Sequence, residues 1–193
     1  MSSLRDRIEL LENDLKAVPP RISVYHDMPF AILRYDPAEE WDLRREVKLL
    51  ATRLEATDKE VHSIPMSEFL WTAIDKTEGL DEVVGLERSR GYLAAQDQVT
   101  TYLSDRDWHP LAKMLEERLK KLNPAKDIAF LTRVAAMAPG IYHMSKLLDL
   151  MQGKTLVTTI LFYPGSIEGT TGLRFMNLED RDALGNYRVK IYG

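Results

Sequence analysis

The chain has 193 residues, a net charge of −4 and no cysteine. The lack of cysteine excludes disulfides, thiolate catalysis, cysteine-ligated zinc and iron–sulfur clusters. No apolar run approaches the ~20 residues that a membrane helix requires, and the first residues lack the apolar core of a signal peptide. We therefore expect a cytoplasmic protein. We also expect a single domain over residues 1–193, because a chain of this length buries enough surface to fold without a disulfide or a structural metal.

An amphipathic helix is predicted over residues 1–18. Ser3 and Asp6 have the spacing of a capping box, and Pro19-Pro20 ends the helical pattern. We expect this helix to pack on its own domain, while the double proline leaves docking on another protein open as an alternative. The charged face includes Arg5. The apolar stripe consists of Leu4, Ile8, Leu11 and Leu15.

The first strand is predicted at Phe30–Tyr35, and Asp36-Pro37 ends it. Because ligands gather at the carboxyl ends of parallel strands, Asp36 is the best placed single carboxylate in the chain. Its simpler role is that of a helix cap or turn former, since Asp-Pro commonly opens a turn. A covering helix at Trp41–Thr57 and a short strand at Glu60–Met66 are expected to follow.

Residues 67–122 have the pattern of a helical insertion. Ser67 is expected to cap a helix that ends at Gly79, and a second helix is predicted over Leu86–Leu103. A third begins at Asp107-Trp108-His109-Pro110 and continues to the end of the insertion. No linker rich in glycine, serine or proline flanks these helices, so we assign them to the same domain.

The main sheet segment is predicted at residues 128–193. Ile128–Val134 is a short apolar run typical of an interior strand, and a crossover helix follows Pro139-Gly140 and ends at Gly153. Leu156–Tyr163 has the strongest strand composition in the chain. We expect this strand to be central and parallel to the one before the helix.

The C-terminal residues are expected to form a sheet edge. The central strand is predicted to break at Tyr163-Pro164-Gly165, and two short strand-like runs follow at Leu173–Met176 and Tyr187–Tyr192. Gly185-Asn186 between them is a hairpin signal. The sequence thus predicts a Rossmann-like three-layer α/β domain with a mainly parallel sheet, a helical insertion in the middle third and short C-terminal edge strands.

Three segments are similar to motifs of catalysis or nucleotide binding, but none has the residue spacing that its motif requires. Gly153-Lys154-Thr155 is similar to the end of a Walker A loop, but Leu148 stands where that loop requires glycine, and the triplet leads from helix to strand. Pro164-Gly165-Ser166 lacks the G-x-S-x-G spacing of a hydrolase elbow. The glycines at 165, 169 and 172 do not follow G-x-G-x-x-G, and we interpret them as turn glycines that could receive a ligand or a partner's backbone.

The histidines give no metal-binding pattern. His26, His62, His109 and His143 form no H-x-x-x-H pair, and none is spaced from a carboxylate as metal-binding helices require. His143 could carry a proton, although a lone helical histidine is typically structural when no nucleophile or orienting group accompanies it. We predict no metal and no cofactor.

The last third of the chain carries a family resemblance. Pro139–Asp149, then Leu161–Gly165, then Leu173–Met176 resemble the BrxB family of the bacterial BREX phage-defence systems. The length is also similar to that of the family's small single proteins. The resemblance implies a component of a multi-protein defence complex, encoded beside an ATPase, a DNA methyltransferase and an alkaline-phosphatase-like protein of the PglZ type.

No catalytic motif is established for the family that the chain resembles. This agrees with the failure of the motifs above to match their required spacing. We therefore expect a non-catalytic adaptor or scaffold subunit that binds another BREX protein, with PglZ as the expected partner, and that supports DNA modification and phage exclusion. Loops at strand ends are natural recognition sites, and tyrosine and arginine are favoured in interface hot spots. The expected partner-binding residues are Tyr163, Pro164, Gly165, Gly169 and Arg174, with Arg5 of the first helix as a second choice.

Two other functions stay open. A degenerate nucleotide-binding or nuclease-like enzyme would use Asp36 with Arg133 or His143 at the strand ends. A DNA-binding accessory protein would use dispersed cations: Arg88, Arg90, Arg106, Lys120, Lys121 and Lys126. Because the chain is acidic, with a sequence pI near 5.6, and these cations include no aromatic platform, we expect no direct DNA binding.

Overall fold

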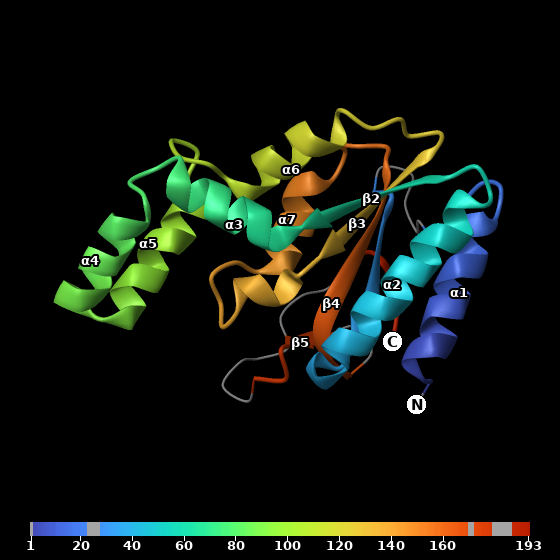
Figure 1. Cartoon of the computed structure of the whole chain (residues 1–193), viewed down its shortest axis with the longest axis horizontal. Helices are drawn as coiled ribbons and strands as arrows, with labels where there is room; N and C mark the ends of the chain where they lie inside the picture. Colours follow the sequence, from blue (N-terminus) through green and yellow to red (C-terminus); the bar gives the residue numbers. More distant parts are fainter. Residues whose placement is uncertain (1, 23–27, 170–171, 179–186) are drawn as a thin grey trace.

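The structure, a computed structural model, describes residues 2–22, 28–169, 172–178 and 187–193 (Figure 1). Its sheet has the strand order β2-β3-β4-β1-β6, and β5 pairs with β4. All pairs are parallel except that between β4 and β5. The strands are β1 (Phe30–Tyr35), β2 (Glu60–Pro65), β3 (Asp127–Thr132), β4 (Thr158–Glu168), β5 (Gly172–Phe175) and β6 (Lys190–Tyr192). The predicted mainly parallel sheet is confirmed, with β4 in its centre.

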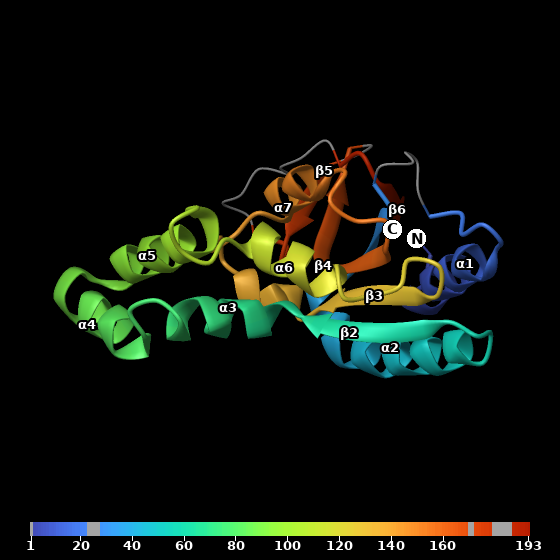
Figure 2. The ribbon, with the colours of Figure 1, turned by 90° about the horizontal axis from the view of Figure 1, so that it is seen from above.

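Helices cover both faces of the sheet, as Figure 2 shows. On one face lie α1 (Leu4–Lys16) and α2 (Glu40–Glu55), and on the other lie α6 (Leu111–Leu119) and α7 (Met144–Met151). Successive residues of β1 alternate between the two cores, because side chains of a strand point to opposite faces. This arrangement confirms the predicted three-layer α/β domain.

The N-terminal helix packs on its own domain, as predicted. Ser3 Oγ accepts a hydrogen bond from the amide of Asp6 at 3.2 Å, and the Asp6 carboxylate accepts one from the amide of Ser3 at 2.9 Å. These bonds form the expected capping box. Arg5 points outward, with its guanidinium 3.8 Å from the Glu46 carboxylate of α2. The predicted apolar stripe is buried in the core: Leu4, Ile8, Leu11 and Leu15.

The predicted insertion, residues 67–122, divides into an arm that extends away from the sheet and α6, which packs on the sheet. The arm consists of α3 (Met66–Asp75), α4 (Leu80–Arg90) and α5 (Tyr92–Ser104), and Figures 1 and 2 place α4 and α5 at the end of the molecule far from α1. The single helix predicted over Leu86–Leu103 is wrong. Gly91 has a φ of 88° and separates two helices, because glycine adopts left-handed backbone at little cost.

The insertion departs from the sequence prediction at one other position. Ser67 lies inside α3, and Pro65 at the end of β2 takes the N-cap position instead. Two short 3₁₀ helices complete the chain in the described residues: η1 (Pro37–Glu39) after β1 and η2 (Val134–Met137) after β3.

The central strand does not break at Tyr163-Pro164-Gly165, contrary to the prediction. It continues to Glu168 and turns into an antiparallel pair with β5. Pro164 can lie inside β4 because its carbonyl still accepts a hydrogen bond, from the amide of Met176 at 2.9 Å. Gly165 has a φ of 152°, and a Cβ at this position would overlap the carbonyl oxygen of Arg174. Glycine is therefore what keeps this segment in strand conformation.

The C-terminal strand pairs with the first strand of the chain. β6 is parallel to β1, with Ala31 opposite Lys190, and forms the edge of the sheet as predicted. The predicted hairpin between the two C-terminal runs is wrong, because β5 pairs with β4 instead; Gly185-Asn186 lies outside the described residues. Asp14 of α1 holds β6 in place. Its carboxylate accepts hydrogen bonds from Lys190 at 2.5 Å and from the Tyr192 hydroxyl at 2.6 Å.

The Asp14 contact makes the attachment of β6 dependent on pH. Burial raises the pKa of Asp14, but the hydrogen bonds from Lys190 and Tyr192 lower it more, so the pKa lies below its ordinary value. A carboxyl group with a depressed pKa stabilises the fold above the pKa of the unfolded chain, about 3.9. That stabilisation is lost as the pH falls through the folded pKa.

We expect Asp14→Asn to lower the free energy of unfolding by about 2 kcal/mol at pH 7, because hydrogen bonds to a charged group are lost. The difference from the parent should shrink towards pH 3. Urea denaturation at the two pH values measures it, with Asp81→Asn on the exposed side of α4 as the control. An equal effect of the two substitutions, or a difference unchanged by acid, would contradict this role of Asp14.

Gly165→Ala tests the conformation of β4. We expect a loss of about 2–4 kcal/mol in the free energy of unfolding, since the new Cβ meets backbone that cannot yield easily. Gly85→Ala is the matched control: it lies within α4 with nothing within 4 Å of the added Cβ and should stabilise by about 0.5–1 kcal/mol. Equal urea midpoints for the two variants would refute the proposed constraint.

Candidate functional site

A groove of about 750 Å³ lies between α2 and the carboxyl ends of β2 and β3. Open parallel sheets commonly bind ligands at the carboxyl ends of their strands, where loops follow the strands. We call it the carboxyl-edge groove. Its defining residues are Trp41, Arg44, Lys48 and Leu49 of α2, Ser63 of β2 and Arg133 after β3.

Helix α2 carries apolar residues both on its buried face and along the groove. The inner stripe packs on the sheet and includes Leu43 and Val47. A second, outward stripe has Trp41 and Leu49 at helical spacing, two turns apart. Their exposed fractions are 76% and 47%, although both are large apolar side chains. Two such residues on the rim of a single groove form an apolar surface that a partner can cover.

Arg44 fixes the orientation of the Trp41 ring. The Arg44 guanidinium carbon lies 4.5 Å from the centroid of the Trp41 ring, within the range of a cation–π contact. The Arg44 Nε also donates to the Glu40 carboxylate at 2.7 Å. Because one turn of helix holds all three groups, little side-chain entropy remains to be lost when a partner covers the indole.

The groove is positively charged. Within the described ranges, neither Lys48 nor Arg133 lies within ion-pair distance of a carboxylate. Arg133 also has a φ of 53°, which is uncommon for a residue with a side chain. Its carbonyl accepts from the amide of Ala136 at 3.1 Å, which ties this turn to η2. The carboxyl-edge groove therefore suits an apolar and acidic surface.

The residues of the enzyme alternative have separate positions. Asp36 caps η1, where its carboxylate accepts from the amide of Ala38 at 2.9 Å, so its simpler predicted role is confirmed. Arg133 follows β3, and β4 lies between β3 and β1, which places the two strands roughly 10 Å apart. His143 is the N-cap of α7 and lines a hollow of only about 20 Å³.

The partner-binding residues predicted at the end of β4 differ in exposure. Tyr163, Pro164 and Gly165 are buried, and burial raises the pKa of the Tyr163 hydroxyl. The Tyr163 ring packs edge-on against Phe175, with 5.5 Å between centroids. These three residues connect the hairpin of β4 and β5 to the core. Contact with a partner at the end of β4 stays a prediction, and Gly169 and Arg174 are the accessible residues that could make it.

Arg174 lies on β5 and contacts the other strand of the same hairpin. It forms an ion pair with Glu168 of β4, and about a quarter of its side chain is exposed. Its Nε is buried without a hydrogen-bond partner in the described residues. Arg174 therefore presents only part of its guanidinium to solvent.

The cations of the DNA-binding alternative lie on separate elements. Arg88 and Arg90 are on α4 in the arm, whereas Lys120 follows α6 on the body of the domain. Lys120 is paired with Glu116 at 2.7 Å. Lys126 lies 3.9 Å from another carboxylate, that of Glu60. The structure does not gather these cations into one surface, and the expected lack of DNA binding stays a prediction.

Residues 62–191 match the family model described as BREX protein BrxB. The chain belongs to the BrxB family. The resemblance found in the sequence is thereby confirmed, and it assigns this BrxB family member to BREX phage defence. Comparison with curated proteins and with solved structures finds no match. Among the described residues, no helix is long and apolar enough to cross a membrane.

The matched range contains only part of the carboxyl-edge groove. Ser63 and Arg133 lie within residues 62–191, whereas α2 precedes them. The sequence pattern of Trp41–Thr57 predicts a covering helix and does not predict the groove beside it. The signal was present, since Trp41 and Leu49 interrupt the polar face of that helix.

Proposed function

We propose that this BrxB family member is a non-catalytic adaptor that binds another BREX protein through the carboxyl-edge groove, with a PglZ-type subunit as the partner. Family membership supports a role within BREX. The observation that carries the proposal is the exposed Trp41 ring, stacked by Arg44 beside a groove of about 750 Å³. Tryptophan and arginine are the residue types most enriched among interface hot spots.

The charge of the groove identifies the kind of surface that fits it. Lys48 and Arg133 have no intramolecular ion pair in the described residues, so their charges are available to a partner. The whole chain has a net charge of −4, which makes this local positive surface a distinct electrostatic target. A complementary partner presents an apolar side chain for Trp41 and Leu49, flanked by carboxylates.

We propose a non-catalytic role because of the positions of the three residues that an enzyme would use at the strand ends. Asp36 is committed to capping η1, and Arg133 and His143 lie at different turns. A nucleophile requires a base within hydrogen-bond reach and an orienting group behind that base. Asp36, Arg133 and His143 form no such arrangement, which supports binding as the role of this edge.

Trp41→Ala tests the interface directly. Loss of a hot-spot tryptophan costs 2 kcal/mol or more, so we expect at least about 30-fold weaker binding to the purified PglZ-type subunit. Because the ring is three-quarters exposed, the melting temperature should stay near that of the parent. Isothermal titration measures the affinity, and co-purification from cells that carry the neighbouring genes checks it.

Two variants locate the interface if it lies elsewhere. Leu93→Ala removes an equally exposed apolar side chain from α5 in the arm, and Arg174→Gln removes the ion pair of the hairpin without placing two carboxylates together. We expect both to retain parental affinity. If either one weakens binding while Trp41→Ala does not, the carboxyl-edge groove is not the interface. Parental affinity in all three would likewise contradict the proposal.

A further inference from the structure

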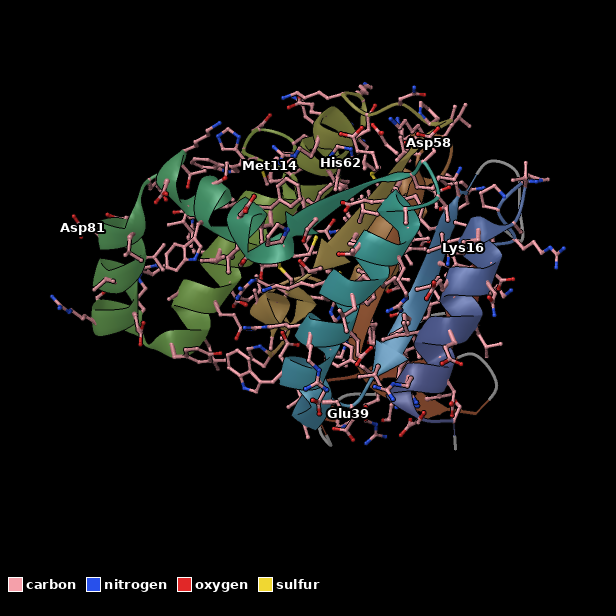
Figure 3. The ribbon with its side chains drawn as sticks, turned by 45° about the vertical axis from the view of Figure 1, so that its right-hand side comes forward. Lys16, Glu39, Asp58, His62, Asp81 and Met114 are labelled. Atoms are coloured by element: carbon pink, nitrogen blue, oxygen red, sulfur yellow. The ribbon has the colours of Figure 1, made fainter. Side chains whose placement is uncertain are left out.

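Three potential metal ligands lie together at the amino ends of β2 and β3. Glu60 and His62 are two residues apart on β2 and therefore point to the same face of the sheet. Asp127 is directly opposite Glu60 in the parallel register, and one donor atom of each residue lies within 4.8 Å of the others. His62 is visible on this edge strand in Figure 3. Its register partner on β3 is Ala129.

One nitrogen of the His62 imidazole lacks a hydrogen bond within the described part of the chain. His62 Nε2 is buried and has no hydrogen-bond partner among the described residues. It lies 3.4 Å from Asp127 Oδ2, which is an ion-pair distance when the imidazole is protonated and is longer than a usual hydrogen bond. That same oxygen already accepts a hydrogen bond from the amide of Asn123 at 2.8 Å. Only 11% of the Asp127 side chain is exposed, so its carboxylate is largely removed from water and is stabilised by a nearby positive charge.

We propose that Glu60, His62 and Asp127 bind one Zn²⁺ ion. Zinc binds imidazole nitrogen and carboxylate oxygen at about 2.0–2.2 Å, so tetrahedral ligands lie about 3.4 Å apart. His62 and Asp127 already have that separation, and Glu60 needs only a small movement to reach it. Water would complete the coordination. The donor set disfavours Mg²⁺, which prefers six oxygen ligands.

One cation competes for this site. Lys126 Nζ lies 3.9 Å from the Glu60 carboxylate, and both side chains are about half exposed. The lysine can therefore turn into solvent when zinc binds. The ion would join β2, which has a neighbour on one side only, to β3. This site is separate from the carboxyl-edge groove, because His62 and Ser63 are consecutive on β2 and point to opposite faces of the sheet, with Ser63 on the face that α2 covers.

Zinc titration of the full chain tests the proposal. Protein freed of metal with a chelator and then dialysed should bind ZnCl₂ with a 1:1 stoichiometry by isothermal titration. At a zinc concentration about 100 times the Kd, the melting temperature should rise by about 5–10 °C. MgCl₂ at the same concentration should leave it unchanged. No binding of zinc, or an equal response to magnesium, would overturn the proposal.

Substitutions identify the ligands. His62→Gln and Glu60→Gln should each weaken zinc binding at least tenfold, and both are accessible enough on the edge strand for the fold to persist. His109→Gln is the matched control, because His109 contacts the carbonyl of Lys76 between α3 and α6 instead. Zinc binding that survives loss of His62 but not of His109 would place the ion elsewhere and exclude this site. Trp41→Ala should leave zinc binding unchanged, which separates this result from the adaptor proposal.

Discussion

Burial of β4 on both of its faces is the constraint on which the rest of the structure depends. Ile160 and Phe162 point into one core, and Leu161 and Tyr163 point into the other. A strand buried in this way must pair along its full length, because unpaired backbone amides and carbonyls away from water are costly. β4 accordingly pairs with β3, β1 and β5. These pairings fix the positions of the strand ends that form the carboxyl-edge groove.

The sheet ends in two edge strands, β6 and β2, and β2 pairs only with β3. The groove lies at the carboxyl end of β2, and the cluster around His62 lies at its amino end. Natural proteins usually protect such an edge, since unpaired strand groups invite association with other chains. In this BrxB family member, α2 and the arm flank the exposed edge. The groove and the cluster, which both suggest binding, thus lie along the same edge strand.

Much of this fold could be predicted from sequence, because local patterns decide it. The capping box at Ser3 and the apolar runs of β1, β3 and β4 gave the correct elements. Longer-range effects were missed: a single glycine, Gly91, divides the insertion into two helices, and β6 pairs with β1 from the far end of the chain. The predicted Tyr163 contact surface is mostly interior, since residue type and position at a strand end do not determine exposure. The approach of His62 to Asp127 could not be predicted, because it depends on the pairing of β2 with β3, whereas Trp41 could be recognised as an apolar residue on the polar face of its helix.

Hydrogen–deuterium exchange tests the adaptor proposal most directly. The chain would be compared alone and mixed with the PglZ-type subunit at concentrations above the Kd. We expect slower exchange in the amides of residues 40–49 and 132–134, which border the carboxyl-edge groove, and unchanged exchange in α4 and α5. Unchanged exchange throughout the chain, or protection confined to segments away from the groove, would contradict the account.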